Sequence, residues 1–180
     1  MQKSSEASRE YTPIGDMQLI GKRRDRKISV KPYGTFSDYV SFYFGPRSPM
    51  LYRIQTGREV EKREPKNIVY FVTKFALVQE HIYIFTDGHA SHHLTAFYND
   101  EANLDAVDWA AVNARYWKDD ADNPDRERRK QAEFLVLEEV NLSSVLGLAV
   151  YDVSTQAIVK DKLEKAGLEM VVKVRRDWYY

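Results

Sequence analysis

The chain has 180 residues, of which 43% are hydrophobic and 30% charged, and its 27 basic side chains balance 27 acidic ones. This length and composition suit one globular domain with its own core and exclude a wholly disordered chain. The absence of cysteine excludes disulfides and thiolate sites, and no apolar run reaches the roughly 20 residues of a membrane helix, so we expect a cytoplasmic protein.

The balanced charge is unevenly distributed along the chain. Residues 1–66 carry a net charge of +6, whereas residues 67–133 carry −5 and the remainder carries −1. The basic excess peaks in the segment 22–27, and the acidic side chains gather in the segment 100–125. A polyanionic partner would therefore meet the first third of the chain, although solvated surface is the simpler interpretation of both segments.

The first third of the chain combines an irregular start with a strand. Residues 1–35 show no hydrophobic period and contain several prolines and glycines, which predicts a long basic segment with little helix. The β-prone run Tyr39–Phe44 predicts a strand that ends at Gly45-Pro46. The prolines at 46 and 49 predict a tight extended turn, and Leu51–Ile54 is compatible with a short strand.

The middle of the chain contains two apolar runs and one helical pattern. The continuous run Asn67–Thr73 is typical of a central strand that is covered on both faces. A second run, His81–Thr86, predicts a strand that Asp87-Gly88 ends. Apolar residues at helical spacing in Leu104–Trp117 predict a helix.

The last third returns to strands around one helix. Phe134–Leu137 and Leu148–Tyr151 predict strands, and a helix is expected from Thr155 to Ala166 with Ser154 as its N-cap. Alternation over residues 170–175 predicts a final strand. Because strands and helices follow one another irregularly, we expect an α+β fold with a mixed sheet and no regular βαβ array.

The common signatures of nucleotide and hydrolase chemistry are missing. The sequence contains no G-x-x-x-x-G-K-[ST], no G-x-G-x-x-G and no G-x-S-x-G elbow. All four histidines lie between His81 and His93, but no H-E-x-x-H pattern is present. We therefore expect histidines that lie at the surface or contact substrate, and no metal site.

Two features favour a chemical role. Glu133 lies directly before the apolar strand Phe134–Leu137, where a rigid element would hold a carboxylate, although a solvated acid at a strand end is commoner. The segment 39–53 is rich in aromatic side chains and also contains Arg47 and Arg53. That mixture suits stacking on nucleobase or nicotinamide rings, although most of these rings are expected in the core.

Four segments together resemble the DarT-type DNA ADP-ribosyltransferase toxins. Phe36–Leu51 (FSDYVSFYFGPRSPML) resembles the family signature HDYVPFYFxPxSPML, and Phe85–His89 (FTDGH) resembles the segment FTDxH. Lys130–Val136 (KQAEFLV) resembles the catalytic strand with its QAE motif, and Trp178-Tyr179 matches a closing WY. The segments keep the family's order, and the resemblance extends from about residue 15 to the end of the chain.

The resemblance implies both a fold and an activity. The expected fold is one ADP-ribosyltransferase-like domain over residues 1–180, with a mixed β-sheet core, flanking helices and a cleft for NAD. The expected enzyme cleaves NAD at its nicotinamide bond and transfers ADP-ribose to thymidine in single-stranded DNA, with NAD as co-substrate and without a metal. Membership of this family also implies a toxin with a macrodomain antitoxin that reverses the modification.

The resemblance also implies roles for individual residues. Glu133 matches the catalytic glutamate, which would stabilise the oxocarbenium-like centre and help to remove the thymine N3 proton. Arg23 matches an arginine that contacts NAD and assists catalysis, with Arg24 as the alternative if the register shifts by one residue. The other implied contacts are Tyr43 and Met50 with NAD, and Arg26, Arg47 and His89 with DNA.

One departure from the family pattern leaves an alternative open. Members of the family open with a strand that carries a His-x-Thr motif for NAD, whereas no histidine precedes His81 here. We expect either a lost start or a shortened member with weakened NAD binding and an exposed sheet edge. The alternative function is a catalytically silent relative that binds single-stranded DNA through the arginines at 23, 24, 26 and 47, and a protein or RNA target is a third possibility.

Overall fold

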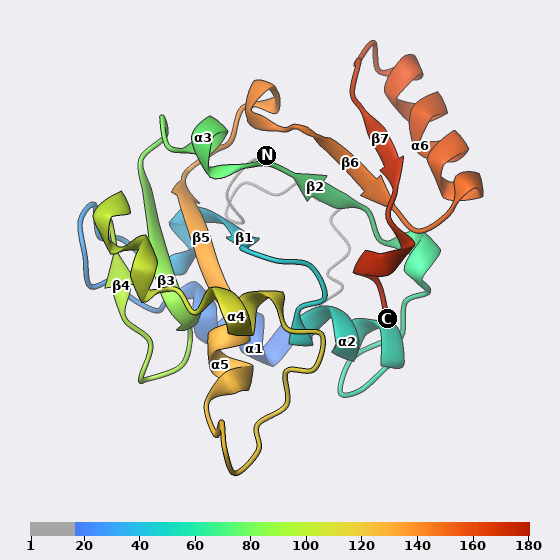
Figure 1. The fold of residues 1–180 in the computed structure, drawn as a ribbon. Helices are drawn as coiled ribbons and strands as arrows, with labels where there is room; N and C mark the ends of the chain where they lie inside the picture. Colours follow the sequence, from blue (N-terminus) through green and yellow to red (C-terminus); the bar gives the residue numbers. More distant parts are fainter. Residues whose placement is uncertain (1–16) are drawn as a thin grey trace.

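Two β-sheets form the framework of the computed structural model, which describes residues 17–180 (Figure 1). The first sheet is antiparallel and has four strands, in the order β1 (Tyr39–Tyr43), β5 (Ala132–Leu137), β3 (Tyr83–His89) and β4 (Phe97–Tyr98). The second sheet has three strands, in the order β2 (Tyr70–Val72), β6 (Gly147–Val150) and β7 (Val172–Val174), of which β6 and β7 are parallel. Within the described residues, the edge strands are β1 and β4 in the first sheet and β2 and β7 in the second.

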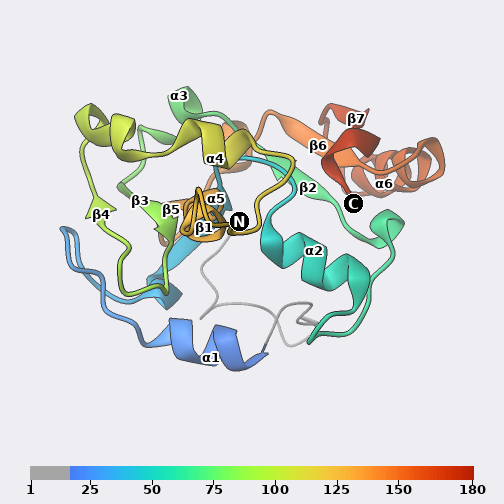
Figure 2. The ribbon, with the colours of Figure 1, turned by 60° about the horizontal axis from the view of Figure 1, so that its bottom comes forward.

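Six α-helices and several 3₁₀ turns connect the strands of the described chain. The helices are α1 (Met17–Arg24), α2 (Pro49–Thr56), α3 (Phe75–Val78), α4 (Trp109–Asn113), α5 (Arg126–Lys130) and α6 (Val153–Lys165). Figure 2 shows α1 and α4 on opposite sides of β1 and β5, while α6 lies along β7. No helix within residues 17–180 is long and apolar enough to cross a membrane.

The two faces of the first sheet bury different side chains. Because alternate residues of a strand face opposite sides, Phe134 and Val136 of β5 pack on the α4 side with Phe85 and Val112. Leu135 packs on the other side, in a smaller cluster built around Ile84, Tyr39 and Phe36. Glu133 therefore lies on the same side of the sheet as Leu135, facing α1.

The predicted α+β class and most of the predicted strands are confirmed. The run at 39–44 contains β1, the runs at 81–86, 134–137 and 148–151 overlap β3, β5 and β6, and the alternating segment 170–175 contains β7. Strand β3 continues through Asp87-Gly88 to His89 by means of a register shift. The expected final helix is α6, but its N-cap is Asp152, whose carboxylate accepts from the Thr155 N–H at 2.7 Å, and not Ser154.

The first third of the chain contains more helix than predicted. Residues 17–24, expected to be irregular, form α1, and residues 1–16 lie outside the described part of the structure. The extended turn and short strand predicted around Leu51–Ile54 are wrong, because Pro49–Thr56 forms α2. Ser48 Oγ accepts from the Leu51 N–H at 3.2 Å, and Pro49 occupies the first helical position, where its missing N–H costs nothing.

Two predictions for the middle of the chain are also wrong. The apolar run Asn67–Thr73 is not a central strand, because β2 covers three residues at the edge of its sheet and Phe71 is 45% exposed. A 3₁₀ turn at Pro65–Asn67 takes up the start of that run. The helix predicted over Leu104–Trp117 is divided into a 3₁₀ segment and the five-residue α4, because Asp108 caps a new start by accepting from Ala111.

Candidate active site

Glu133 and Arg23 form a buried ion pair between β5 and α1. The side chain of Glu133 is almost fully buried, with 1% of the residue exposed, and its Oε2 accepts from Arg23 Nη2 at 2.5 Å. Burial lowers the pKa of Arg23, but the negative charge of Glu133 and the hydrogen bond to its carboxylate act against burial, and the pKa is raised overall. The pair therefore places a charged carboxylate beside a charged guanidinium inside the fold. Glu133 is not the solvated acid that strand ends commonly carry.

Strand β3 and the loop after it hold the second oxygen and the backbone of Glu133. Oε1 accepts from the Ala90 N–H at 3.1 Å, so both carboxylate oxygens have a donor. The Glu133 N–H donates to Thr86 Oγ1 at 3.0 Å, and the same hydroxyl donates to the Gly88 carbonyl at 2.7 Å. These contacts fix the orientation of the carboxylate from two sides, which is the arrangement needed for a preorganised charge.

Tyr43 and Met50 lie beside the ion pair. Tyr43 is the cross-strand partner of Glu133 in the pairing of β1 with β5. Its pKa is raised, first by burial and then by the charge of Glu133, so the phenol is neutral and can donate. The hydroxyl lies 3.9 Å from the Met50 sulfur, which connects the first turn of α2 to the site. Tyr43 therefore lies opposite Glu133, and Met50 contacts Tyr43.

His89 ends β3 near the same carboxylate. Burial lowers the pKa of His89, and the positive charge of Arg23 lowers it further against the opposing effect of Glu133. Its Nδ1 accepts from the Ser91 N–H at 3.2 Å, which leaves Nε2 as the nitrogen that carries the proton of the neutral ring. His89 can therefore offer an N–H donor to a neighbouring group at neutral pH.

The three arginines of the segment 23–26 have different surroundings. Arg23 meets Glu133 and lies over the Phe36 ring at 5.1 Å, whereas Arg24 is exposed. Arg26 donates to the His92 carbonyl at 3.1 Å, and burial lowers its pKa, with the charge of Arg23 adding to the effect. Arg23 and Arg24 were the two arginines that the resemblance left open for contact with NAD, and of these Arg23 is the one that contacts Glu133.

Arg47 lies in a tight turn between β1 and α2. Its backbone is left-handed, with φ of 55°, and its carbonyl accepts from the Tyr180 hydroxyl at 2.5 Å. The Nε atom of Arg47 is buried and has no hydrogen-bond partner within the described part of the chain. This part of the guanidinium is thus held against the body of the protein.

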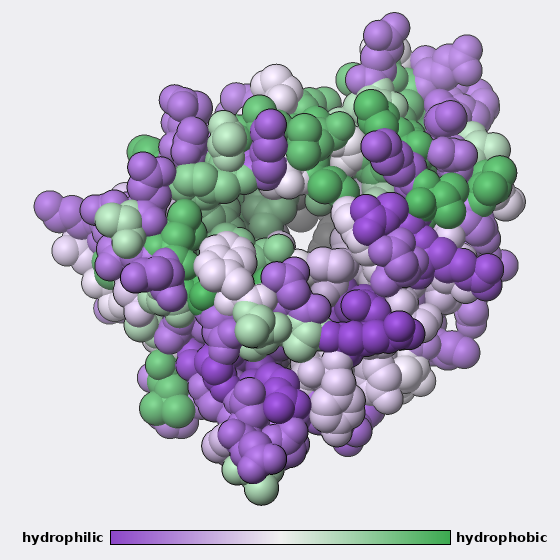
Figure 3. Space-filling model, in the orientation of Figure 1, coloured by the Kyte–Doolittle hydropathy of each residue, from purple (hydrophilic) through white to green (hydrophobic). Residues whose placement is uncertain are grey.

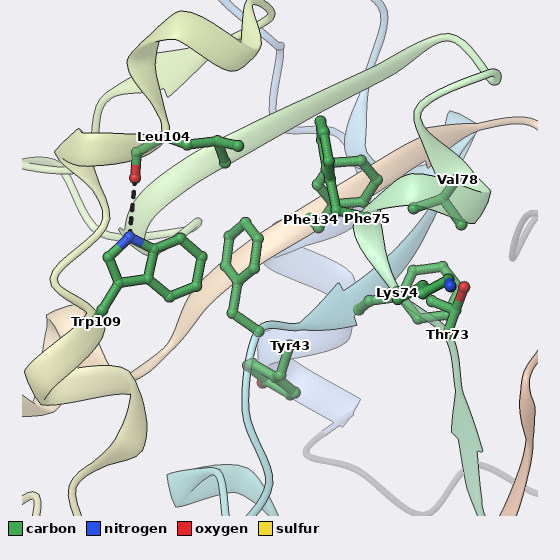
Figure 4. Close-up of a pocket in the computed structure, with 10 residues that line it drawn as sticks. Tyr43, Thr73, Lys74, Phe75, Val78, Leu104, Trp109 and Phe134 are labelled. Carbon is green, nitrogen blue, oxygen red and sulfur yellow. Dashed lines mark hydrogen bonds between the residues drawn. The ribbon is translucent and has the colours of Figure 1, made fainter.

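A cavity of about 300 Å³ lies on the α4 side of β1 and β5 and is shown in Figure 4. Its walls are mainly aromatic and come from β1, β5, α4 and the segment between β2 and α3; they include Phe42, Phe44, Phe75, Trp109 and Phe134. The Trp109 indole N–H donates to the Leu104 carbonyl at 3.2 Å and so has a partner. Tyr43 also lines the cavity, whereas its cross-strand partner Glu133 faces the opposite side of β5 from Phe134.

The acidic segment before β5 is paired internally by the arginines of α5. Arg128 bridges Asp87 at 3.0 Å and Asp125 at 2.8 Å, and Arg129 contacts Asp108. Figure 3 shows the hydrophilic surface that these side chains form over α5 and the loop before it. Within residues 17–180 no group of three or more histidines and carboxylates is arranged to hold a metal ion.

Sequence reasoning located the main pair but missed its supports. The family segments indicated Glu133 and Arg23, while the contribution of Ala90 comes from a backbone N–H and has no side-chain signal. Thr86 belongs to the quoted FTDGH segment, so the resemblance pointed to its position without a role. Lys130, which is 5% exposed, appeared only as one of several basic residues in its segment.

Comparison with known proteins gives consistent matches over nearly the whole chain. The family described as "ssDNA thymidine ADP-ribosyltransferase, DarT" matches residues 1–180. A DNA ADP-ribosyl transferase of Escherichia coli O127:H6 (strain E2348/69 / EPEC) is 37% identical over 170 residues, covering 93% of this chain and 78% of that protein.

Solved structures of a Thermus relative agree with these matches. The fold is similar to Thermus sp. 2.9 DarT in complex with ADP-ribosylated ssDNA, with a TM-score of 0.93, 29% identity, and coverage of 100% of this chain and 87% of that one. The same protein in complex with NAD⁺ gives a TM-score of 0.86. A more distant relative, from Thermosipho africanus, is a DNA ADP-ribosyl transferase fused to a DNA ADP-ribosyl glycohydrolase; it is 23% identical over 160 residues, which are 88% of this chain and 39% of the fusion.

Proposed function

Since the chain belongs to the DarT family of single-stranded DNA thymidine ADP-ribosyltransferases, we propose that it transfers ADP-ribose from NAD to thymidine in single-stranded DNA with Glu133 and Arg23 at the reacting centre. The observation that carries the assignment of these two residues is their ion pair, in which a carboxylate that is 1% exposed is held by Arg23 and by the Ala90 N–H. Burial of a charged side chain destabilises a fold unless the charge is paired and hydrogen-bonded. Glu133 also lies at the position of the glutamate in the QAE motif of the family.

The reaction exchanges one bond at the ribose carbon of NAD for another. The bond between that carbon and the nicotinamide nitrogen breaks, and nicotinamide leaves with the electron pair. Positive charge then develops on the ribose, and the fixed carboxylate of Glu133 stabilises it electrostatically. Thymine N3 forms the new bond to the same carbon and releases its proton, which Glu133 accepts as a general base and passes to water.

Positive side chains around the carboxylate suit the remaining groups of the substrates. Arg23 donates to Glu133 through one nitrogen and keeps other donors for a pyrophosphate oxygen. In this proposal Tyr43 and Met50 contact NAD, and Arg26, Arg47 and His89 meet the DNA strand. The exposed Arg24 adds long-range attraction for phosphates but does not touch the reacting atoms.

The family context extends the proposal beyond the reaction. NAD and DNA both occur in the cytoplasm, so we place the protein there as a toxin. The fusion of a transferase with a glycohydrolase in the Thermosipho relative supports a macrodomain antitoxin as the partner that removes the modification. The described residues form one ADP-ribosyltransferase-like domain in this proposal, with the NAD cleft on the Glu133 side of β5.

The test uses NAD and short oligonucleotides that contain either one thymidine or none. We expect mass spectrometry to find one added ADP-ribose on the thymidine oligonucleotide only, together with release of nicotinamide. Glu133→Gln should reduce the rate at least 10²-fold, while Glu139→Gln, an exposed acid two residues beyond the end of β5, serves as the matched control. Binding of the oligonucleotide without any modification by the wild type would favour the silent DNA-binding alternative, and full activity of Glu133→Gln would remove Glu133 from its role.

A further inference from the structure

We propose that Lys130 and Tyr180 are positioning residues that hold the Arg47 turn (residues 45–48) in the conformation in which it binds DNA. The inference rests on the proposed function, in which Arg47 contacts the DNA strand. Its geometric basis is that two side chains from distant parts of the chain donate to two consecutive carbonyls of this turn, those of Pro46 and Arg47.

Lys130 holds the turn from the side of β5. Its side chain leaves the end of α5, is 5% exposed, and donates through Nζ to the Val112 carbonyl at 2.5 Å and the Pro46 carbonyl at 3.3 Å. No carboxylate within residues 17–180 forms an ion pair with it. A buried ammonium with only carbonyl partners destabilises the fold. We therefore attribute the location of Lys130 to its contact with the turn and not to a gain in stability.

Tyr180 holds the next carbonyl from the other end of the chain. Its hydroxyl donates to the Arg47 carbonyl at 2.5 Å and accepts from the Trp117 indole N–H at 2.6 Å. Its backbone N–H donates to Gln55 Oε1 at 2.9 Å, and its ring lies edge-on to Tyr52 with centroids 5.2 Å apart. The hydroxyl is therefore anchored on both sides and can fix the position of the turn.

The turn needs such support because its conformation is unfavourable in isolation. Arg47 is a non-glycine residue with φ of 55°, and such backbone strain persists only where the surroundings enforce it. Gly45 approaches α4 so closely that a Cβ atom there would lie 2.9 Å from the Val112 carbonyl oxygen. The same carbonyl accepts a hydrogen bond from Lys130, so Val112 contacts both Gly45 of the turn and the lysine that holds the turn. The two donors to the turn, Lys130 and Tyr180, are called the clamp below.

The clamp connects the turn to the reacting centre. Lys130 lies three residues before Glu133 in the chain, and Met50, just after the turn, contacts the Tyr43 hydroxyl opposite Glu133. Releasing the two carbonyls should therefore displace Arg47 relative to Glu133. The displacement of Arg47 should weaken DNA binding and leave NAD binding unchanged. A general destabilisation of the fold would weaken both.

The experiment measures two dissociation constants on the full chain. Fluorescence anisotropy gives Kd for a labelled oligonucleotide with one thymidine, and calorimetry gives Kd for NAD. Tyr180→Phe and Lys130→Met should each raise Kd for the oligonucleotide about 3- to 10-fold, the effect of losing a hydrogen bond, and leave Kd for NAD unchanged. Tyr52→Phe removes a hydroxyl from the same aromatic cluster and is the matched control.

Salt dependence separates positioning from direct contact. Arg47→Met should lower the slope of log K against log salt by about 0.7, the value for one phosphate contact to a single strand, and adding Lys130→Met to Arg47→Met should lower it no further, because Lys130 acts through Arg47. A further reduction of the slope in that double variant, or wild-type oligonucleotide affinity for Tyr180→Phe, would overturn the clamp while transferase activity stood. If the wild type binds the oligonucleotide without modifying it, the proposed function fails, and the two affinities still decide the clamp.

Discussion

Removing Arg23 should destabilise the fold, because it strands a carboxylate that is 1% exposed. Breaking a buried ion pair by deleting one partner costs about 3–5 kcal/mol. Here Glu133 keeps its hydrogen bond from Ala90 at 3.1 Å, and the Arg23 side chain is 18% exposed, so water reaches part of the pair. Both features lower the expected loss for Arg23→Met to about 2–3 kcal/mol.

Urea unfolding followed by circular dichroism measures this loss. With a slope of about 2 kcal/mol/M, the unfolding midpoint of Arg23→Met should fall by about 1 M. Arg24→Met is the matched control, because Arg24 is exposed and adjacent, and its free energy of unfolding should stay within about 0.5 kcal/mol of wild type.

The double variant Arg23→Met/Glu133→Gln isolates the interaction itself. It removes both charges, so no unpaired ion is left buried, and its loss should be smaller than the sum of the single losses by about 1–2 kcal/mol. If the single losses instead add within about 0.5 kcal/mol, the two side chains do not interact in solution. The proposed catalytic geometry would then lose its basis.

Three further outcomes are expected elsewhere in the chain. Burial lowers the pKa of Lys130 from 10.5 to about 8, so between pH 8 and pH 10.5 the folded chain binds fewer protons than the unfolded chain. The free energy of unfolding of the wild type should therefore rise over this range when it is compared with that of Lys130→Met. A difference between the two proteins that does not change with pH would contradict this. Gly88→Ala should cost about 1–3 kcal/mol in chemical denaturation, since its Cβ would lie 2.9 Å from the Arg128 carbonyl oxygen. An NMR titration should place the pKa of His89 below 6.5, and a value above 6.5 would show that the charge of Glu133 outweighs the effect of burial.

The fold could be predicted from the sequence where the signal was local. Phe134–Leu137 is an uninterrupted apolar run, and it forms the last four residues of β5, of which the first three are buried. The same reasoning failed for Asn67–Thr73. An apolar run indicates that its side chains are buried, but it does not show whether the strand has neighbours on one side or on both. Helix α2 was missed although Ser48-Pro49 is a capping pattern, since two prolines three residues apart also suit an extended turn.

The candidate site could be predicted only in part. Glu133 and Arg23 are separated by 110 residues, and no local pattern specifies that they meet. The resemblance to the family supplied both positions, and the fold shows that Arg23 contacts Glu133. The donors from Ala90 and Thr86 depend on the register shift within β3, which local propensity does not determine.

The pairing of charges within the fold explains why a chain with zero net charge can still attract DNA. The net charge of −5 over residues 67–133 already includes the arginines of α5, which hold several of the acids in place: Arg128 bridges Asp87 and Asp125, and Arg129 contacts Asp108. In the first third, by contrast, no ion pair among residues 17–180 involves the exposed cations Arg24, Lys27 and Lys31. A phosphate backbone responds to charge that is free at the surface and close to it, since salt screens more distant charges. The segment that precedes β1 therefore presents its positive charge to a polyanion on the same side of the sheet as Glu133, where α1 lies.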